Sequence, residues 1–381
     1  MDALTTPSNW QRVRLGDIAT FLKGKGLSKS QVSPNAKHEC ILYGELFTHY
    51  DRVVTNIKSF TNIYDNPMLS LNNDVLMSGS AETPDILATA SCILKKGVIL
   101  GGDILIIRSD SNLLNGCFLA YCIVCDKNQV LSKVVGSTVY HLYAKDMKDF
   151  EIPLPPLNEQ IAIANILSDV DHYLYSLRAL ILKKESVKKA LSFELLSQRK
   201  RLKGFNQNWQ KVRLGDIANY LTSNLSVEQI TQQGKFKVYD VNNFIGYTDT
   251  TFISDKPYIS IVKDGSVGRV RILPPKTNIL STMGALIANH KTTTEFLFYL
   301  LSNFDFKNFT SGSIIPHIYF KDYKEKTIFL PPLNEQIAIA NILSALDSEI
   351  ISLKNKKRQF ENIKKALNHD LMSAKIRVLN K

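Results

Sequence analysis

Apolar residues recur at alternating steps of three and four positions along two long stretches of the chain. Each stretch starts directly after a double proline and continues for about 40 residues without another Gly or Pro. Such spacing is typical of a coiled-coil seam, and proline is tolerated in the first turn of a helix. We therefore predict two long helices, capped by Asn158 and Asn334, that pair because each has a single apolar stripe. The predicted pairing residues are Leu167, Val170, Leu174, Leu177, Leu343, Leu346, Ile350 and Leu353.

The two stretches belong to an internal duplication. The segment LPPLNEQIAIANILS occupies residues 154–168 and returns unchanged at residues 330–344. A second segment, WQRVRLGDIA at residues 10–19, returns as WQKVRLGDIA at residues 209–218. Identity of this length is more than a short functional motif requires, so we infer that one ancestral unit was doubled. The alternative for the long stretches is two separate helices, each packed on its own domain.

Between the repeated segments the two halves share little sequence. Residues 20–135 and residues 219–310 each alternate short β-rich runs with turns. Each half is long enough to bury its own core. We predict a mixed α+β fold, in which two globular α/β domains are joined by two long antiparallel coiled-coil helices in a pseudo-twofold repeat. After the first helix comes a charged linker whose Gly204 suits a helix end. The expected segments are a first domain at 1–153, a first helix and linker at 154–204, a second domain at 205–329 and a second helix at 330–381.

Charge and cysteine content narrow the classes of function. The formal net charge of +12 suits a polyanionic partner, but residues 1–153 contain 15 basic and 15 acidic residues, so nucleic-acid contact there needs a local patch. Five cysteines clustered in the first third argue against a disulfide framework. Cys122 and Cys125 form a single CxxC, for which buried small side chains are a simpler interpretation than zinc. Because no apolar run reaches membrane-spanning length and the N-terminus lacks signal-peptide features, we expect a cytoplasmic protein.

Motifs for catalysis are missing from the sequence. We find no P-loop, no GxGxxG after a strand, no GxSxG, no HExxH and no Asn/Asp-Pro-Pro-aromatic tetrapeptide of the amino-methyltransferases. The seven histidines show no metal-ligand spacing. We therefore expect no catalytic residue, no metal and no cofactor on this chain.

Two Gly-Ser loops are the best candidates for ligand contact. GSTVYHLYAKDMK (residues 136–148) matches GSIIPHIYFKDYK (residues 312–324) at seven positions. Small residues let the backbone approach a phosphate, and Ser, His and Lys can donate to phosphate oxygens or base edges. The alternative is that the loop only docks each domain on its helix. The candidate residues here are Gly136, Ser137, Thr138, His141, Lys145, Gly312, Ser313, His317, Tyr319 and Lys321.

Loops in the divergent middles supply further candidates. The first middle contains KGKGLSKS and SGSAET, and the second contains a hairpin-like KDGSVGRVR followed by STMG. Such loops can place polar side chains on base edges, although basic surface loops are often merely solvated. The candidate residues are Lys23, Lys25, Ser28, Ser78, Ser80, Glu82 and Thr83 in the first middle, and Lys263, Asp264, Ser266, Arg269 and Thr282 in the second.

Together, the duplicated WxxVRLGDIA, GSxxxHxY and LPPLNEQIAIANILS segments resemble the specificity subunit of type I restriction–modification enzymes over almost the whole chain. The resemblance implies two target-recognition domains, each reading one half of an asymmetric, split DNA sequence, with the helices setting the gap. It also implies two docked modification subunits that carry S-adenosylmethionine and methylate adenine, and restriction subunits that use ATP and Mg. The chain itself would then be non-catalytic, would bind double-stranded DNA and would have no contact with a membrane. Half-site centres about 34 Å apart would place both domains on one duplex face.

Two other classes of function stay open at the level of the sequence. One is a scaffold, with two protein-binding domains on a coiled-coil hairpin and no nucleic acid. The other is a nuclease or methyltransferase with an unrecognised site. DNA binding by the chain together with modification subunits would separate recognition from scaffolding, and methyl transfer by this chain alone would support the enzyme.

Overall fold

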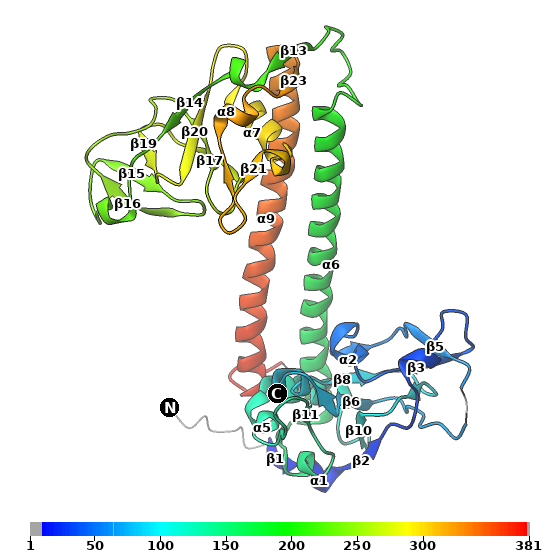
Figure 1. Ribbon diagram of the computed structural model, residues 1–381. Helices are drawn as coiled ribbons and strands as arrows, with labels where there is room; N and C mark the ends of the chain where they lie inside the picture. Colours follow the sequence, from blue (N-terminus) through cyan, green and yellow to red (C-terminus); the bar gives the residue numbers. More distant parts are fainter. Residues whose placement is uncertain (1–9, 64, 379–381) are drawn as a thin grey trace. The chain divides into compact units, whose positions relative to one another are not determined.

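The computed structural model describes residues 10–63 and 65–378. The prediction that the chain begins without a signal peptide concerns residues 1–9, which lie outside the described part. Both apolar-periodic stretches form helices of 40 residues, α6 (Leu157–Leu196) and α9 (Leu333–Met372) (Figure 1). The two predicted long helices are thus confirmed.

The described chain divides into two compact units. The first unit contains residues 10–178, apart from residue 64, together with residues 355–378. The second unit contains residues 179–354. Each unit therefore holds a globular region and a part of each long helix, whereas the segments drawn from the sequence separate globular region from helix.

The first unit is built around a five-stranded sheet. Its strands are β1 (Gln11–Arg14), β2 (Ala19–Lys23), β3 (His38–Ile41), β4 (Val53–Val54), β5 (Ser59–Thr61), β6 (Asp74–Ser78), β7 (Ser80–Ala81), β8 (Ser91–Ile93), β9 (Ile99–Leu100), β10 (Ile104–Ser109), β11 (Tyr140–His141) and β12 (Glu151–Leu154). The central sheet has the order β2-β10-β6-β8-β4, beside a three-stranded sheet β5-β3-β9 and the pairs β1-β12 and β11-β7. The short helices are α1 (Leu15–Ile18), α2 (Glu45–Thr48), α3 (Pro84–Leu87), α4 (Gly116–Cys125) and α5 (Lys127–Leu131).

The second unit repeats this plan. Its strands are β13 (Gln210–Arg213), β14 (Ala218–Thr222), β15 (Phe236–Tyr239), β16 (Phe244–Thr248), β17 (Tyr258–Val262), β18 (Val270–Leu273), β19 (Thr277–Ile279), β20 (Met283–Ala288), β21 (Thr310–Ser311), β22 (His317–Ile318) and β23 (Thr327–Leu330). They form sheets of order β14-β20-β17-β18 and β16-β15-β19 and the pairs β13-β23 and β21-β22, with helices α7 (Thr294–Ser302) and α8 (Phe320–Tyr323). The predicted mixed α/β repeat is confirmed, and the divergent middles share a sheet plan that their sequences do not reveal.

The duplicated segments adopt matching registers in the two units. Strand β1 pairs antiparallel with β12, with Gln11 opposite Leu154. Strand β13 pairs with β23 in the same way, with Gln210 opposite Leu330. Each pair joins the opening of a globular region to the strand that leads into a long helix, so the duplicated frame closes both globular regions alike.

The long helices lie beside each other within each unit (Figure 1). In the first unit Lys364 pairs with Asp171, and Arg178 pairs with Glu361 at 3.3 Å. In the second unit Lys354 on α9 pairs with Glu185 on α6 at 2.6 Å. In both units later residues of one helix pair with earlier residues of the other, so the helices are antiparallel. The residues predicted to pair the helices divide into buried Leu167, Leu174, Leu177, Leu343 and Ile350, and half-buried Val170, Leu346 and Leu353.

A buried glutamate near the start of each helix is held by a tryptophan and an arginine. In the first unit Glu159 accepts from Trp10 Nε1 at 3.1 Å and from Arg377 Nε at 2.7 Å. In the second unit Glu335 accepts from Trp209 Nε1 at 3.0 Å and from Arg201 Nη2 at 2.7 Å. We call each Trp–Glu–Arg set a clasp. Each arginine follows the end of one long helix and binds near the start of the other, so each clasp ties an antiparallel pair together.

The helix ends differ from the sequence prediction. Asn158 and Asn334 are not N-caps, because each lies inside the first turn, where its side chain accepts from the next backbone N–H. Nor does Gly204 end α6, because the helix stops at Leu196 and Gln198 takes the left-handed conformation with φ of 62°. Because the left-handed residue here is not a glycine, a prediction that looks for glycine misses this helix end.

Helix α9 contains a long apolar stretch. By length and composition alone, α9 is the one described helix that could cross a membrane, contrary to the sequence prediction that no run is long enough. Its apolar side chains Ile339, Ala340 and Leu343 are buried in the core of the second unit, and its acidic Asp347 pairs with Lys188. These contacts explain part of the apolar stretch as a packing surface, whereas Ile337, Ile342 and Ile351 stay exposed.

Candidate nucleic-acid interface

Each Gly-Ser loop folds back onto the loop that follows a central strand. In the first unit β11 pairs with β7, which places His141 opposite Ser80. In the second unit His317 forms a bridge with Asp264, two residues after the end of β17. Both histidines come from the duplicated frame, and both partners come from the divergent middles. The structure thereby brings together candidates that lie far apart in the sequence.

The histidine side chains are bound by these same partners. His141 Nδ1 and Ser80 Oγ lie 3.1 Å apart. His317 Nδ1 donates to Asp264 Oδ1 over 2.7 Å. Both histidines are half-buried, and their Nδ1 atoms are occupied by contacts within the protein. The remaining ring nitrogen, Nε2, is the atom of each imidazole that a ligand could engage.

A tyrosine and a lysine continue the surface from each histidine. His141 stacks on Tyr143 with ring centroids 6.3 Å apart, and Lys145 Nζ lies 5.7 Å from the Tyr143 ring. The second unit has equivalent separations of 6.4 Å and 5.5 Å. Both tyrosines are about half exposed, at 48% and 49%. We call this surface the His–Tyr–Lys face, made of His141, Tyr143 and Lys145 in the first unit and of His317, Tyr319 and Lys321 in the second.

The glycines of the Gly-Ser loops are required by the turn itself. Gly136 has a φ of +120°, and a Cβ there would meet the Val139 carbonyl oxygen at 2.2 Å. Gly312 has a φ of +87°, and a Cβ would meet the Ile315 carbonyl oxygen at 2.3 Å. The local turn therefore accounts for both glycines. Ser137, Thr138 and Ser313 lie exposed on these turns.

Lys23 is linked to the first His–Tyr–Lys face only indirectly, through a series of bonds. Its Nζ lies 3.2 Å from Asp103, whose carbonyl accepts from the Gly79 amide at 2.6 Å. The Gly79 carbonyl in turn accepts from Leu142, next to His141. By contrast, Lys25 binds the carbonyl of Asn66, and Ser28 bonds within its own short turn. The glycine-rich basic segment is therefore split between two places.

The remaining candidates of the first middle differ in exposure. Ser78 is fully buried, and its hydroxyl donates to the Ser80 carbonyl over 2.7 Å, so it supports the sheet end from inside. Glu82 and Thr83 are exposed just beyond β7, where Thr83 precedes α3. These two side chains extend the surface that starts at Ser80.

In the second unit the hairpin and the STMG segment meet at one end of the sheet. Lys263 donates its backbone N–H to the Thr282 carbonyl at 3.1 Å and accepts from the Ile318 amide at 2.9 Å. These bonds hold Asp264 beneath His317. The side chain of Ser266 is exposed on the same turn. Arg269 lies on the far limb of the hairpin, where it binds Asn242 Oδ1 at 2.9 Å.

The STMG segment is explained by packing. A Cβ on Gly284 would meet the Tyr220 hydroxyl at 2.3 Å, because the Tyr220 ring covers this glycine. Tyr220 stacks on Phe320 with centroids 4.5 Å apart. Burial and, second, the negative charge of Asp264 raise the pKa of Tyr220. A neutral phenol thus lies beside the Asp264–His317 pair.

Some surface residues next to the candidates were missed by the sequence prediction. Tyr143 belongs to the first face as Tyr319 belongs to the second, and alignment of the duplicated loops is the signal that finds it. Ile314, 92% exposed at the tip of its turn, is a second omission. Its signal is an apolar pair inside a glycine turn. Asn242, which also binds Arg271 through its carbonyl at 2.9 Å, has no signal in the local sequence.

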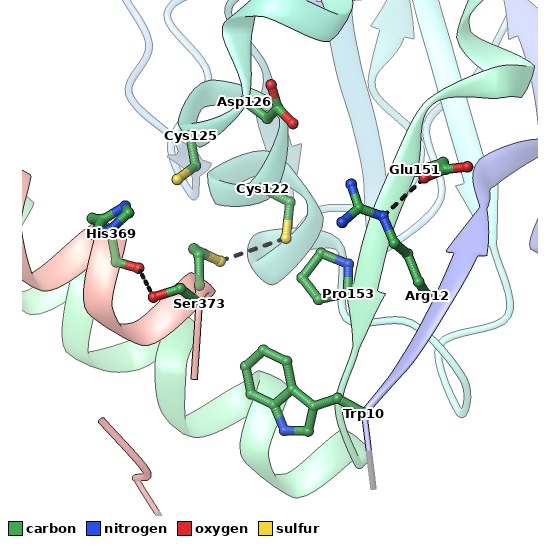
Figure 2. Close-up of a pocket in the computed structure, with 10 residues that line it drawn as sticks. Trp10, Arg12, Cys122, Cys125, Asp126, Glu151, Pro153, His369 and Ser373 are labelled. Carbon is green, nitrogen blue, oxygen red and sulfur yellow. Dashed lines mark hydrogen bonds and ion pairs between the residues drawn. The ribbon is translucent and has the colours of Figure 1, made fainter. Parts of the chain in front are cut away.

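A pocket in the first unit contains two cysteines and a histidine, residue types that also occur in enzymatic sites. Figure 2 shows it between the end of α4 and the end of α9. Its volume is about 240 Å³. Cys122 is buried against Met372, while Cys125 is exposed, so only Cys122 fits the predicted buried role. Although Cys125 is exposed as a residue, partial desolvation of its thiol and, second, the negative charge of Asp126 raise the pKa of the thiol, which disfavours a reactive thiolate. No group of three or more His, Cys, Asp or Glu side chains among the described residues could hold a metal ion.

Comparison with known proteins bears on both halves of the chain. A family model described as the type I restriction modification DNA specificity domain matches residues 7–185 and residues 206–362. The MjaVIII type I restriction enzyme specificity subunit of Methanocaldococcus jannaschii is 26% identical, with 100% of this chain and 96% of that protein covered. The MjaX specificity subunit from the same organism is 30% identical, with 73% of this chain and 72% of that protein covered.

Solved structures show the same fold. The S subunit of a type I restriction–modification system from M. genitalium has a TM-score of 0.69 at 21% identity, and the similarity covers 96% of each chain. A chain from a structure on complex assembly and conformational transition of a type I system has a TM-score of 0.53 at 16% identity, covering 97% of this chain and 98% of that one. At these identities the likeness concerns the fold.

Proposed function

The chain belongs to the family of type I restriction–modification DNA specificity subunits, and from this membership we propose that each unit reads one half of a split, asymmetric DNA target through its His–Tyr–Lys face. The observation that carries the proposal is the repetition of this face. Both units present the same three residue types, in the same stacking arrangement, next to inserts of different sequence. The shared frame would contact DNA of any sequence. Because the two inserts differ, they suit two dissimilar half-sites.

The roles of the side chains follow from their chemistry. Lys145 and Lys321 would contact phosphates, which supplies affinity without selecting a sequence. Residues of the inserts would select bases, with Ser80, Glu82 and Thr83 in the first unit acting through hydrogen bonds to base edges. In the second unit the exposed Ile314 side chain suits contact with a thymine methyl group.

We further propose that the long helices dock two modification subunits and set the unread gap. Those subunits would bind S-adenosylmethionine and methylate adenine, and restriction subunits with ATP and Mg would join the complex. The chain would act without catalytic residues, in the cytoplasm. Repeated contacts support a role in assembly, since both units hold α6 and α9 together by a clasp and by ion pairs.

An exchange of inserts tests the reading of half-sites. Residues 20–135 are replaced by the equivalent insert of a relative with another target, and methylated adenines are sequenced in a host that expresses the complex. We expect one half of the methylated motif to change while the other half and the gap stay. As a matched control, exchange of residues 219–310 should change the opposite half. A motif that changes in both halves, or in neither, would contradict the proposal.

Mobility of a random duplex pool separates recognition from scaffolding. The purified chain together with modification subunits should retard the duplex, and retardation should weaken as salt rises. Substitution of both face lysines, Lys145→Ala with Lys321→Ala, should reduce retardation. Failure of the unsubstituted complex to bind any duplex would favour the scaffold.

A further inference from the structure

The two histidines of the His–Tyr–Lys faces differ in the partner at Nδ1. Ser80 is neutral and can either donate or accept, so it is compatible with a proton on either nitrogen of His141. Asp264, when ionised, only accepts, so the His317 Nδ1 must carry a proton. The histidine is the same in both units. One residue of each insert therefore determines which hydrogen bonds that histidine can form.

Asp264 would be unfavourable at a DNA contact without compensation. Its side chain is 28% exposed and lies beside a proposed contact with a polyanion, which repels a carboxylate. A doubly protonated His317 would cancel this charge and would present Nε2–H as a donor. In the first unit the neutral Ser80 needs no such compensation.

We propose that Asp264 is a positioning residue for His317, holding the Nδ1 proton and making the imidazolium the form that contacts DNA, whereas Ser80 leaves His141 to contact DNA as a neutral group. This inference rests on the proposed function, in which both histidines lie at the DNA surface. It adds that DNA binding by the second unit takes up one proton and that binding by the first does not. Position 80 in the first unit and position 264 in the second thus determine how the shared histidine contributes.

The surroundings of His317 contain other charged or titratable groups. They are Lys263 next to Asp264, Tyr319 and Lys321 after β22, and Tyr220 on β14 beside Asp264. Tyr220, with its raised pKa, stays neutral in the neutral pH range. Among these groups, His317 is the one imidazole, and it is the group that Asp264 binds directly.

The test measures duplex affinity as a function of pH. The full-length chain binds a fluorescent duplex of mixed sequence at constant ionic strength, between about pH 6 and about pH 9. Affinity should fall as pH rises, by up to about tenfold per pH unit for one linked proton. Asp264→Asn keeps an acceptor for Nδ1–H but removes the charge, so its affinity should be nearly independent of pH. Ser266→Ala, on the same exposed turn, removes no titratable group and is the matched control: any loss of affinity should be the same at every pH, so the shape of the pH profile should be kept.

The first unit supplies the converse variant. Ser80→Asp should add a second pH-dependent contribution, and Ser80→Asp combined with His141→Gln should lose it again. A pH profile that is flat in the unsubstituted chain, or that survives Asp264→Asn unchanged, would overturn the inference.

The histidine variants separate the two levels of argument. If His141→Gln and His317→Gln both bind duplex as the unsubstituted chain does at every pH, the faces do not contact DNA, and both the proposed contact and this inference fail. If both substitutions weaken binding but Asp264→Asn keeps the pH profile, the contact stands and the role of Asp264 is refuted.

Discussion

The clasp of the first unit allows a quantitative prediction about stability. Glu159 is only 2% exposed, and Arg377, 34% exposed, binds it through two nitrogens at 2.7 and 3.0 Å. Arg377→Ala would leave the buried Glu159 carboxylate without its cationic partner. Within the clasp, only the indole N–H of Trp10 would still donate to it. Loss of one partner from a buried ion pair costs about 3–5 kcal/mol. Since a third of the Arg377 side chain is exposed, water can enter in its place, and we expect a cost of about 3 kcal/mol.

The converse substitution should cost less. Glu159→Gln removes the buried charge and keeps an oxygen that can accept from Trp10, while the Arg377 side chain remains in contact with water. We expect about 1 kcal/mol, the ordinary value of a weakened hydrogen bond. The asymmetry follows from burial, because the carboxylate is the member of the pair that water cannot reach.

The two tryptophans of the chain provide the assay. Trp10 and Trp209 each belong to one clasp, so Trp209→Phe leaves a fluorophore that reports on the first unit alone. Urea unfolding in this background, followed by fluorescence, gives the free energy of unfolding for each variant. Arg12→Ala is the matched control, since its ion pair with Glu151 is 63% and 48% exposed and should contribute at most about 1 kcal/mol.

One result would refute the reasoning. If Glu159→Gln destabilises the first unit as much as Arg377→Ala does, the cost cannot arise from a stranded buried carboxylate. The second clasp gives an independent check, because Glu335 is fully buried and Arg201 is 26% exposed. In the reciprocal Trp10→Phe background, Arg201→Ala should therefore cost more than Arg377→Ala does in the first unit.

Three other predictions concern the DNA contact, the turn and alkaline pH. Lys145→Ala and Lys321→Ala should each lower the slope of log affinity against log salt by about 1, measured by duplex titration, and an unchanged slope would exclude a phosphate contact. Gly312→Ala should lower the melting temperature more than Gly204→Ala, because both have positive φ but only Gly312 has a carbonyl oxygen at 2.3 Å from the added Cβ. Burial raises the pKa of Tyr258 to about 12, so its stabilisation, complete below about pH 10, should be lost as pH rises toward 12. Urea unfolding at several alkaline pH values checks this, and Tyr258→Phe should lack that loss.

Local pattern was sufficient for the long helices and for the duplication. The alternation of three and four steps depends only on neighbours along one helix, and it predicted both 40-residue elements. Cap positions failed because they depend on single residues: the left-handed residue after α6 is Gln198 and not a glycine, and Asn158 is already the second residue of the helix. The CxxC interpretation failed for Cys125 for a similar reason, since exposure at the end of α4 is decided by what packs there.

The sequence by itself determined the repeated frame, its helical periodicity and its family, because identity and periodicity can be compared along the chain without knowing any contact. Tertiary structure alone decided which side chains meet. His141 reaches Ser80 over 61 positions, His317 reaches Asp264 over 53, and Arg377 reaches Glu159 over 218. Such contacts depend on how sheets and helices pack, and unrelated inserts can build the same sheet plan because many apolar sequences fill a core equally well.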